Sequence, residues 1–122
     1  MSNNEAAVNF LKLAASGHAR EAFAAHTAPN FRHHNPGFAG GAQALMEAMD
    51  ENARRNPHKK LSVKRAIAEG DLVAVHSHVQ HNETERGYAL AHIFRFENER
   101  IAELWDLAME VPAESPNEYG MF

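Results

Sequence analysis

The chain has 122 residues, with 12 Lys and Arg against 16 Asp and Glu, and a formal net charge of −4. This length suits one domain, residues 1–122, with one core, and the acidic balance argues against a nucleic-acid partner. The lack of cysteine excludes disulfides and thiol chemistry and fits a cytoplasmic location. The apolar residues 6–15 are broken by Asn9 and Lys12 and have no basic leader, so we expect neither a signal peptide nor a membrane partner.

The first half of the chain predicts three helices. Apolar residues recur at helical spacing over residues 6–14, with an N-cap among residues 2–4 and a stop at Gly17. A second helix fits residues 18–28, and Pro29 ends it. Residues 31–37 are predicted to be a short extended piece that runs into a turn, because the residue before Pro36 is pushed out of the helical region. A third helix fits residues 42–55.

The second half of the chain has the two-residue period of β-strands. Strands are predicted over residues 60–69, 72–81, 88–96 and 101–109. In the second of these, valines alternate with polar residues, so that His76 and His78 share the face opposite Val75. Helices followed by a run of antiparallel strands predict an α+β fold.

Several segments together resemble the SnoaL-like polyketide cyclases of the nuclear-transport-factor-2 (NTF2-like) superfamily. The segments are residues 33–36 (HHNP), 69–78 (EGDLVAVHSH), 92–98 (HIFRFEN) and 101–106 (IAELWD), and residues 117–122 resemble the tail of the SnoaL-like aldol-condensation subgroup. The resemblance covers nearly the whole chain. It implies a cone-shaped fold in which N-terminal helices pack on a curved antiparallel sheet, with a pocket in the mouth of the cone. It also implies a homodimer.

The resemblance further implies a catalytic pair. Cyclases of this family are held to use an acidic residue as base at the position of Asp106, with a histidine nearby at the position of His92. Asp106 would then remove a proton from a carbon between two carbonyl groups, and the enolate would attack a second carbonyl and close a ring. His92 would orient Asp106 or donate a proton to the alkoxide. This chemistry needs no cofactor.

The facing of His92 and Asp106 depends on the hairpin that joins their strands. A two-residue loop at Asn98 and Glu99 places His92 opposite Trp105, which leaves Asp106 on the other face. A three-residue loop that includes Arg100 places His92 opposite Asp106, with Cβ atoms about 5 Å apart. We favour the three-residue loop on the resemblance.

Other side chains are candidates for binding a small apolar molecule. His34 and Asn35 are expected at the pocket mouth, and Trp105 and Phe94 as apolar walls. His76 and His78 are expected to line the pocket or the dimer face. A metal site there would need a third ligand, and no spacing in the sequence supports one, so we expect no metal. Lys59 is interpreted as part of a solvated helix end.

Three hypotheses for function remain open at this point. The first is a small enzyme that acts on an apolar, carbonyl-bearing molecule. The second is a non-catalytic binding module with the same pocket, favoured if His92 and Asp106 lie on opposite faces of the sheet. The third is a dimeric interaction module, which predicts a pocket filled by side chains such as Trp105 and Phe94.

Overall fold

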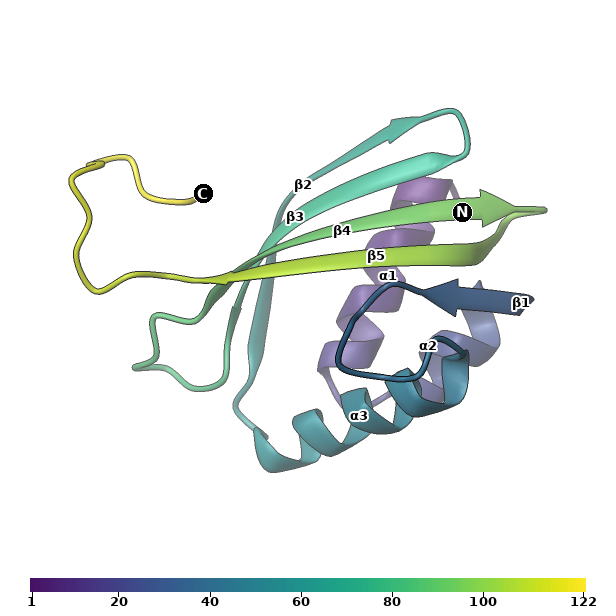
Figure 1. Cartoon of the computed structure of the whole chain (residues 1–122), viewed down its shortest axis with the longest axis horizontal. Coiled ribbons are helices and arrows are strands. Elements are labelled where there is room, and N and C mark those ends of the chain that lie inside the picture. The colour runs from purple at the N-terminus through teal and green to yellow at the C-terminus, as the bar shows by residue number, and fades with distance from the viewer.

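The computed structural model describes residues 1–122 and confirms the α+β class. Three helices and five strands follow one another along the chain (Figure 1): α1 (Asn3–Ala15), α2 (Ala19–His26), β1 (Thr27–His33), α3 (Ala42–Arg55), β2 (Lys60–Glu69), β3 (Leu72–Gln80), β4 (Tyr88–Glu97) and β5 (Arg100–Glu110). The four strands predicted in the second half are all present, with ends that differ by at most one residue. None of the three helices has the length and apolar content needed to cross a bilayer.

Helix α1 is fixed at its start by a capping box. The Ser2 hydroxyl accepts a hydrogen bond from the Glu5 backbone N–H, and the Glu5 carboxylate accepts one from the Ser2 backbone N–H. These contacts satisfy two of the donors that every helix start leaves without an intrahelical partner. The helix buries Phe10 and Leu11, and the Phe10 ring meets Phe94 of β4 edge-on, with 6.0 Å between ring centroids.

The second helix is shorter than predicted, because a strand begins inside its expected range. Helix α2 ends at His26, and Thr27 starts β1, which pairs in parallel with β5. Pro29 fits this strand because β1 lies at the edge of the sheet, where one side of the backbone needs no partner. The sheet is therefore mixed, which corrects the expectation of a wholly antiparallel sheet. The alanines of residues 19–28 favour a helix in sequence, whereas pairing with β5 decides the structure of residues 27 and 28.

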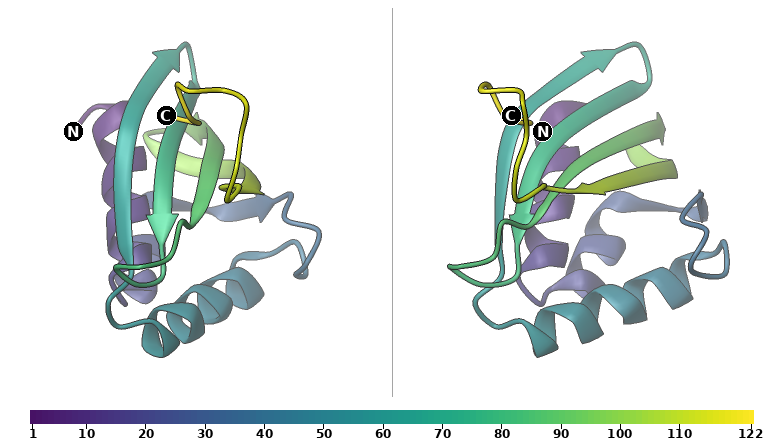
Figure 2. Two further views of the ribbon diagram at one scale, coloured as in Figure 1. Left: turned by 90° about the vertical axis from the view of Figure 1, so that its left-hand side faces the viewer. Right: turned by 60° about the vertical axis from the view of Figure 1, so that its left-hand side comes forward.

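The sheet has the order β1-β5-β4-β3-β2 and is strongly curved (Figure 2). Its inner face, which the helices cover, carries alternate residues of each strand, including Val75 of β3, His92 of β4 and Leu104 of β5. The outer face carries the residues between them. Larger apolar side chains remain exposed on that outer face at Leu72, Ile93, Leu107 and Met109.

The hairpin between β4 and β5 combines a short turn with a bulge. Glu97 pairs with Arg100, so the loop has two residues, Asn98 and Glu99, both with positive φ (49° and 67°). These angles are those of a turn that suits hairpins. The expected three-residue loop is therefore wrong. Ala102, however, is an extra residue in β5, because Phe96 pairs with Ile101 and Arg95 pairs with Glu103.

The bulge shifts the register by one residue, and this shift decides which side chains meet. Beyond Ala102, His92 pairs with Asp106, and Ile93 pairs with Trp105. The predicted facing of His92 and Asp106 is thus confirmed, although through a bulge rather than a longer loop.

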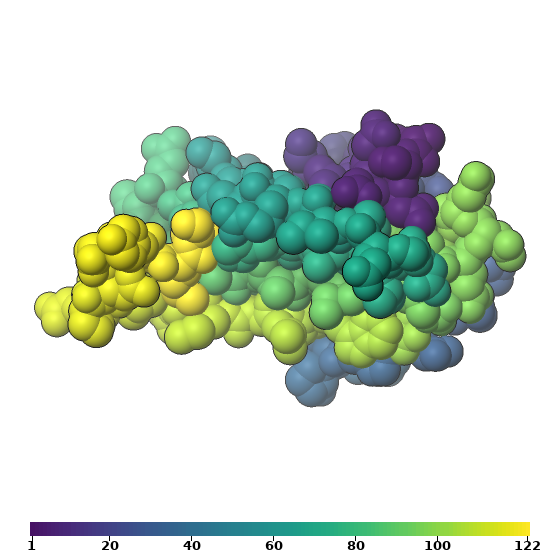
Figure 3. All heavy atoms as spheres, turned by 90° about the horizontal axis from the view of Figure 1, so that it is seen from above, coloured from purple at the N-terminus to yellow at the C-terminus, as the bar shows by residue number.

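The C-terminal residues return to the outer face of the sheet. Figure 3 shows them gathered at one end of the molecule, next to β2. The Phe122 ring stacks on His78 at 4.3 Å and on His76 at 5.6 Å between centroids, and the Lys64 ammonium lies 5.4 Å from its centre. The tail therefore covers a pair of histidines that would otherwise face solvent.

Candidate functional site

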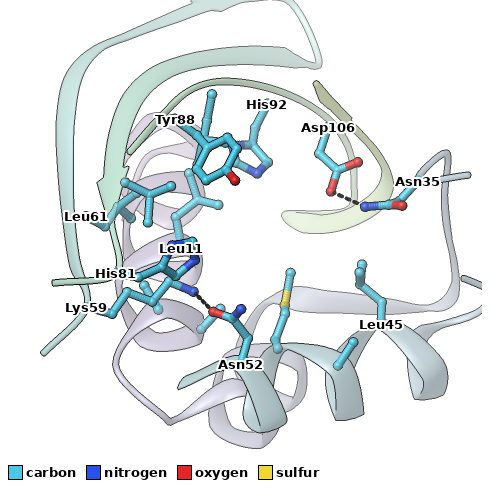
Figure 4. A pocket seen from close by; sticks show the side chains of 16 residues that line it. Leu11, Asn35, Leu45, Asn52, Lys59, Leu61, His81, Tyr88, His92 and Asp106 are labelled. Atoms are coloured by element: carbon cyan, nitrogen blue, oxygen red, sulfur yellow. Dashed lines mark hydrogen bonds between the residues drawn. The ribbon is translucent and has the colours of Figure 1, made fainter. Parts of the chain in front are cut away.

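A cavity of about 310 Å³ lies between the inner face of the sheet and helices α1 and α3 (Figure 4). Sixteen residues line it, of which ten are hydrophobic. Its apolar part includes Leu11 of α1, Leu45 of α3 and Leu61 of β2. Its six polar side chains are Asn35, Asn52, Lys59, His81, His92 and Asp106, and the ring of Tyr88, counted with the hydrophobic residues, adds a hydroxyl group. An apolar cavity with a few polar groups is typical of sites for small molecules.

His92 and Asp106 lie side by side in the wall of this cavity. They occupy paired positions of β4 and β5 on the inner face, and both side chains point into the hollow (Figure 4). Paired residues of neighbouring antiparallel strands have Cβ atoms about 5 Å apart, so one small ligand can touch both side chains.

Asn35 fixes one oxygen of Asp106. Its side-chain N–H donates to Asp106 Oδ2 at 3.1 Å, while its own Oδ1 accepts from the Gly37 backbone N–H at 2.8 Å. The turn at Pro36 thus holds the amide, and the amide holds the carboxylate. The other oxygen, Asp106 Oδ1, is buried and has no hydrogen-bond partner. A polar atom left in this state costs about 1–3 kcal/mol, which a bound ligand could recover.

His92 is buried and makes no hydrogen bond through its Nδ1. Burial lowers the pKa of His92 from 6.5 to about 4, and the nearby Asp106 charge opposes this effect in part. The imidazole is therefore neutral at pH 7 and carries one N–H. A neutral imidazole beside a carboxylate can donate a hydrogen bond to a carbonyl or enolate oxygen while the carboxylate takes a proton.

Of the six residues expected to bind a small molecule, Asn35 lines this cavity, and the structure places the other five elsewhere: His34, Phe94, Trp105, His76 and His78. Phe94 lies on the inner face but packs in the core against Phe10. Trp105 directly precedes Asp106 in β5, so the alternation of a strand places it on the outer face. There it stacks on His34, with 4.9 Å between ring centroids and 2° between planes.

His76 and His78 also lie on the outer face. They alternate in β3 with Val75, Ser77 and Val79, which are buried on the inner face. Their neighbour is Phe122 rather than the cavity. No group of three or more His, Asp or Glu side chains in the chain has an arrangement that could hold a metal ion.

An ion-pair network that the sequence did not suggest supports the site from the outer face. Glu103 accepts hydrogen bonds from His34 at 2.6 Å, from Arg95 at 3.0 Å and from Arg32 at 3.1 Å. The bond from His34, together with those from the two arginines, lowers the pKa of Glu103 to about 2. The network joins β1, β4 and β5 next to the positions that carry Asn35 and Asp106.

The end of the cavity that Lys59 and Asn52 form was not predicted from the sequence. Lys59 was expected to be solvated, but it lines the cavity and donates to Asn52 Oδ1 at 2.5 Å. A signal was available, since Lys59 directly precedes β2, and a two-residue period continued back from Leu61 places both side chains on the same side. Asn52 likewise follows Leu45 and Met49 of the same helix face at spacings of seven and three.

Three solved structures with the same fold are less than 25% identical in sequence to this chain, so they show the fold alone. A proposed ketosteroid isomerase from Kribbella flavida is 20% identical, with a TM-score of 0.71 over 96% of this chain and 85% of that chain. AclR, a proposed hydroxylase from Streptomyces galilaeus, is 18% identical, with a TM-score of 0.71 over 88% of each chain. An NTF2-like protein of unknown function from Cytophaga hutchinsonii is 15% identical, with a TM-score of 0.71 over 89% of this chain and 91% of that chain.

No curated protein matches the sequence. The SnoaL-like domain, in contrast, matches residues 7–104, which include β1 to β4 and the first part of β5. The curved sheet, the covering helices and this match together show that the chain belongs to the family of SnoaL-like domains.

Proposed function

We propose that this chain is a small enzyme that removes a proton from a carbon next to a carbonyl group in an apolar molecule. Asp106 is the base, and neutral His92 binds the oxygen that becomes negative. An aldol-type ring closure, as in the polyketide cyclases that the chain resembles, is the reaction that we propose. The observation that carries the proposal is the pairing of His92 and Asp106 in the wall of an apolar cavity, each with a buried polar atom that lacks a partner.

The proposed steps balance without a further reactant. The C–H proton passes to Asp106, and its electron pair becomes the enolate, whose oxygen accepts a hydrogen bond from His92. The enolate carbon then forms a bond with a second carbonyl carbon of the same molecule. The resulting alkoxide takes back the proton that Asp106 removed, which regenerates the carboxylate. A proton transfer of this kind needs only a base and a hydrogen-bond donor at the right places, and positioned side chains accelerate it by about 10²–10⁴-fold.

Two observations support this proposal over the alternatives. A binding module without activity would be favoured by His92 and Asp106 on opposite faces of the sheet. The two residues instead share the inner face. An interaction module predicted a cavity filled by Trp105 and Phe94, but neither of these residues lines the open cavity. A non-catalytic module that binds an apolar metabolite remains the second candidate, and the experiment below separates the two.

The test substrate is nonane-2,4,8-trione, in which the acidic carbon C3 can attack C8 and close a six-membered ring. Product formation is followed by chromatography with the wild type, Asp106→Asn and a control, Asp71→Asn, which changes an exposed aspartate of the β2–β3 turn. We expect Asp106→Asn to lose at least about 100-fold in rate and Asp71→Asn to keep it.

Binding of the trione by calorimetry decides between the two functions. Binding without ring closure in the wild type would favour the binding module. Equal ring closure by the wild type and Asp106→Asn would remove Asp106 from the mechanism.

A further inference from the structure

The cavity has two polar ends with different charge. Figure 4 shows Asp106 and Asn35 on one side and Lys59, with Asn52 and His81, on the opposite side. Apolar side chains of α1, α3 and β2 lie between these ends. The first end holds the Asp106 carboxylate, whose charge acts on His92, and the second end holds the Lys59 amine.

Lys59 has no carboxylate partner within the chain. Its ammonium group donates to the neutral Asn52 amide oxygen, and none of the ion pairs of the chain includes it. The side chain is half-buried, and this burial lowers the pKa of Lys59. A cation removed from water without an opposite charge nearby is destabilised, and a bound anion would stabilise its charged form again.

The neighbours of Lys59 favour an oxygen-rich ligand group. The His81 ring is held from behind by the Glu85 carboxylate, with 2.9 Å between His81 Nδ1 and Glu85 Oε2, and its edge meets the Tyr88 ring. Figure 4 shows the Tyr88 hydroxyl directed into the cavity. Glu85 itself does not line the cavity, so no carboxylate of the protein competes for this end.

We infer that the substrate carries a single carboxylate, which binds Lys59 at this end of the cavity while its reacting carbonyl lies at Asp106. This inference rests on the proposed function for the reacting end and on Lys59 for the other. A single lysine at this end suits a monoanion, whereas a phosphate would call for several cationic donors. The negative Asp106 repels a carboxylate, so the two charges also select one orientation of the ligand.

The probe is 4,6-dioxoheptanoate, a β-diketone with a carboxylate at one end, and its matched partner is 4,6-dioxoheptanamide, which has the same shape without the charge. Both are titrated into the wild type, Lys59→Met and Lys60→Met by calorimetry. Lys60 is the control because it is the adjacent lysine and is exposed. We expect the wild type to bind the acid at least about tenfold more tightly than the amide.

The variants show whether Lys59 is the cause of this preference. Lys59→Met should bind the two probes equally, while Lys60→Met should keep the preference. Equal binding of the probes by the wild type, or an unchanged preference in Lys59→Met, would overturn the inference. A covalent adduct on Lys59 after borohydride treatment with the amide would also overturn it, since Lys59 would then act as a Schiff-base amine.

Failure of this inference and failure of the proposed function give different results. If the probes bind equally but ring closure of the neutral trione still depends on Asp106, only the carboxylate site is lost. If ring closure does not depend on Asp106 but the acid is preferred through Lys59, the cavity binds an anion without the proposed chemistry.

Discussion

Burial of His92 should make the folded state sensitive to acid in a defined pH range. The pKa of His92 is lowered to about 4 from 6.5, so between these values the unfolded chain binds a proton here and the folded chain does not. The stability contributed by the neutral ring is therefore complete above pH 6.5 and falls as the pH drops toward 4. From pH 7.5 to 4.5 the loss in free energy of unfolding should be about 2.5 kcal/mol.

The measurement is urea unfolding of the wild type and His92→Gln at a series of pH values between 4.5 and 7.5. The variant lacks the titrating ring, so its profile should be flatter than that of the wild type by the amount given above. Burial also lowers the pKa of His26, but this effect is the same in both proteins and cancels in the difference. Glu103 loses its stabilising charge only below its ordinary value of 4.5. Parallel profiles would refute the assignment of a buried, neutral His92.

Three further predictions concern stability and assembly. Gly87→Ala should destabilise the fold by at least about 3 kcal/mol, because φ is +78° and the new Cβ would lie 2.0 Å from the Val79 carbonyl oxygen. The control is Gly17→Ala, which has φ +86° but open space around it, and it should cost only about 1–2 kcal/mol. Thermal or urea unfolding of both variants measures these losses. Ser77→Ala should raise the free energy of unfolding by up to about 1 kcal/mol, since the buried hydroxyl has no partner; a clear loss of stability would contradict this reasoning. The homodimer that the resemblance implies should use the exposed apolar outer face, so Leu107→Lys, at a side chain 67% exposed, should give a monomer by light scattering, and a monomeric wild type would contradict this choice.

Most of the fold follows from local pattern in the sequence. The two-residue period of the second half predicts β2 to β5, and it is clearest in β3 and β4, where buried residues alternate with more exposed ones. Strand β1 was predicted only at its end, as part of the extended piece over residues 31–37. Its start could not be found in this way, since Ala28 and Pro29 give no strand signal and only the distant β5 supplies its hydrogen bonds. Long-range pairing is not visible in a short window of residues.

The candidate site was predictable only in part, because two of its features depend on backbone geometry. His92 faces Asp106 only because of the bulge at Ala102, and no residue type at that place indicates a bulge. The same alternation that places Asp106 inside excludes Trp105, His76 and His78 from the cavity, so a stricter use of the two-residue period would have placed these residues on the outer face. The place of Lys59 in the cavity also follows if that period is continued from Leu61 to the residue before β2.

The bulge residue Ala102, rather than the two-residue hairpin turn, determines which side chains of β5 line the cavity. If β5 paired with β4 through the same two-residue turn but with Ala102 in the ladder, opposite Arg95, every later side chain of β5 would move to the opposite face of the sheet. An indole would then face the hollow, and the acid would face the outside. Within this fold the presence of one unpaired residue, with no substitution at all, therefore decides whether a carboxylate or an indole lies beside His92 in the cavity wall.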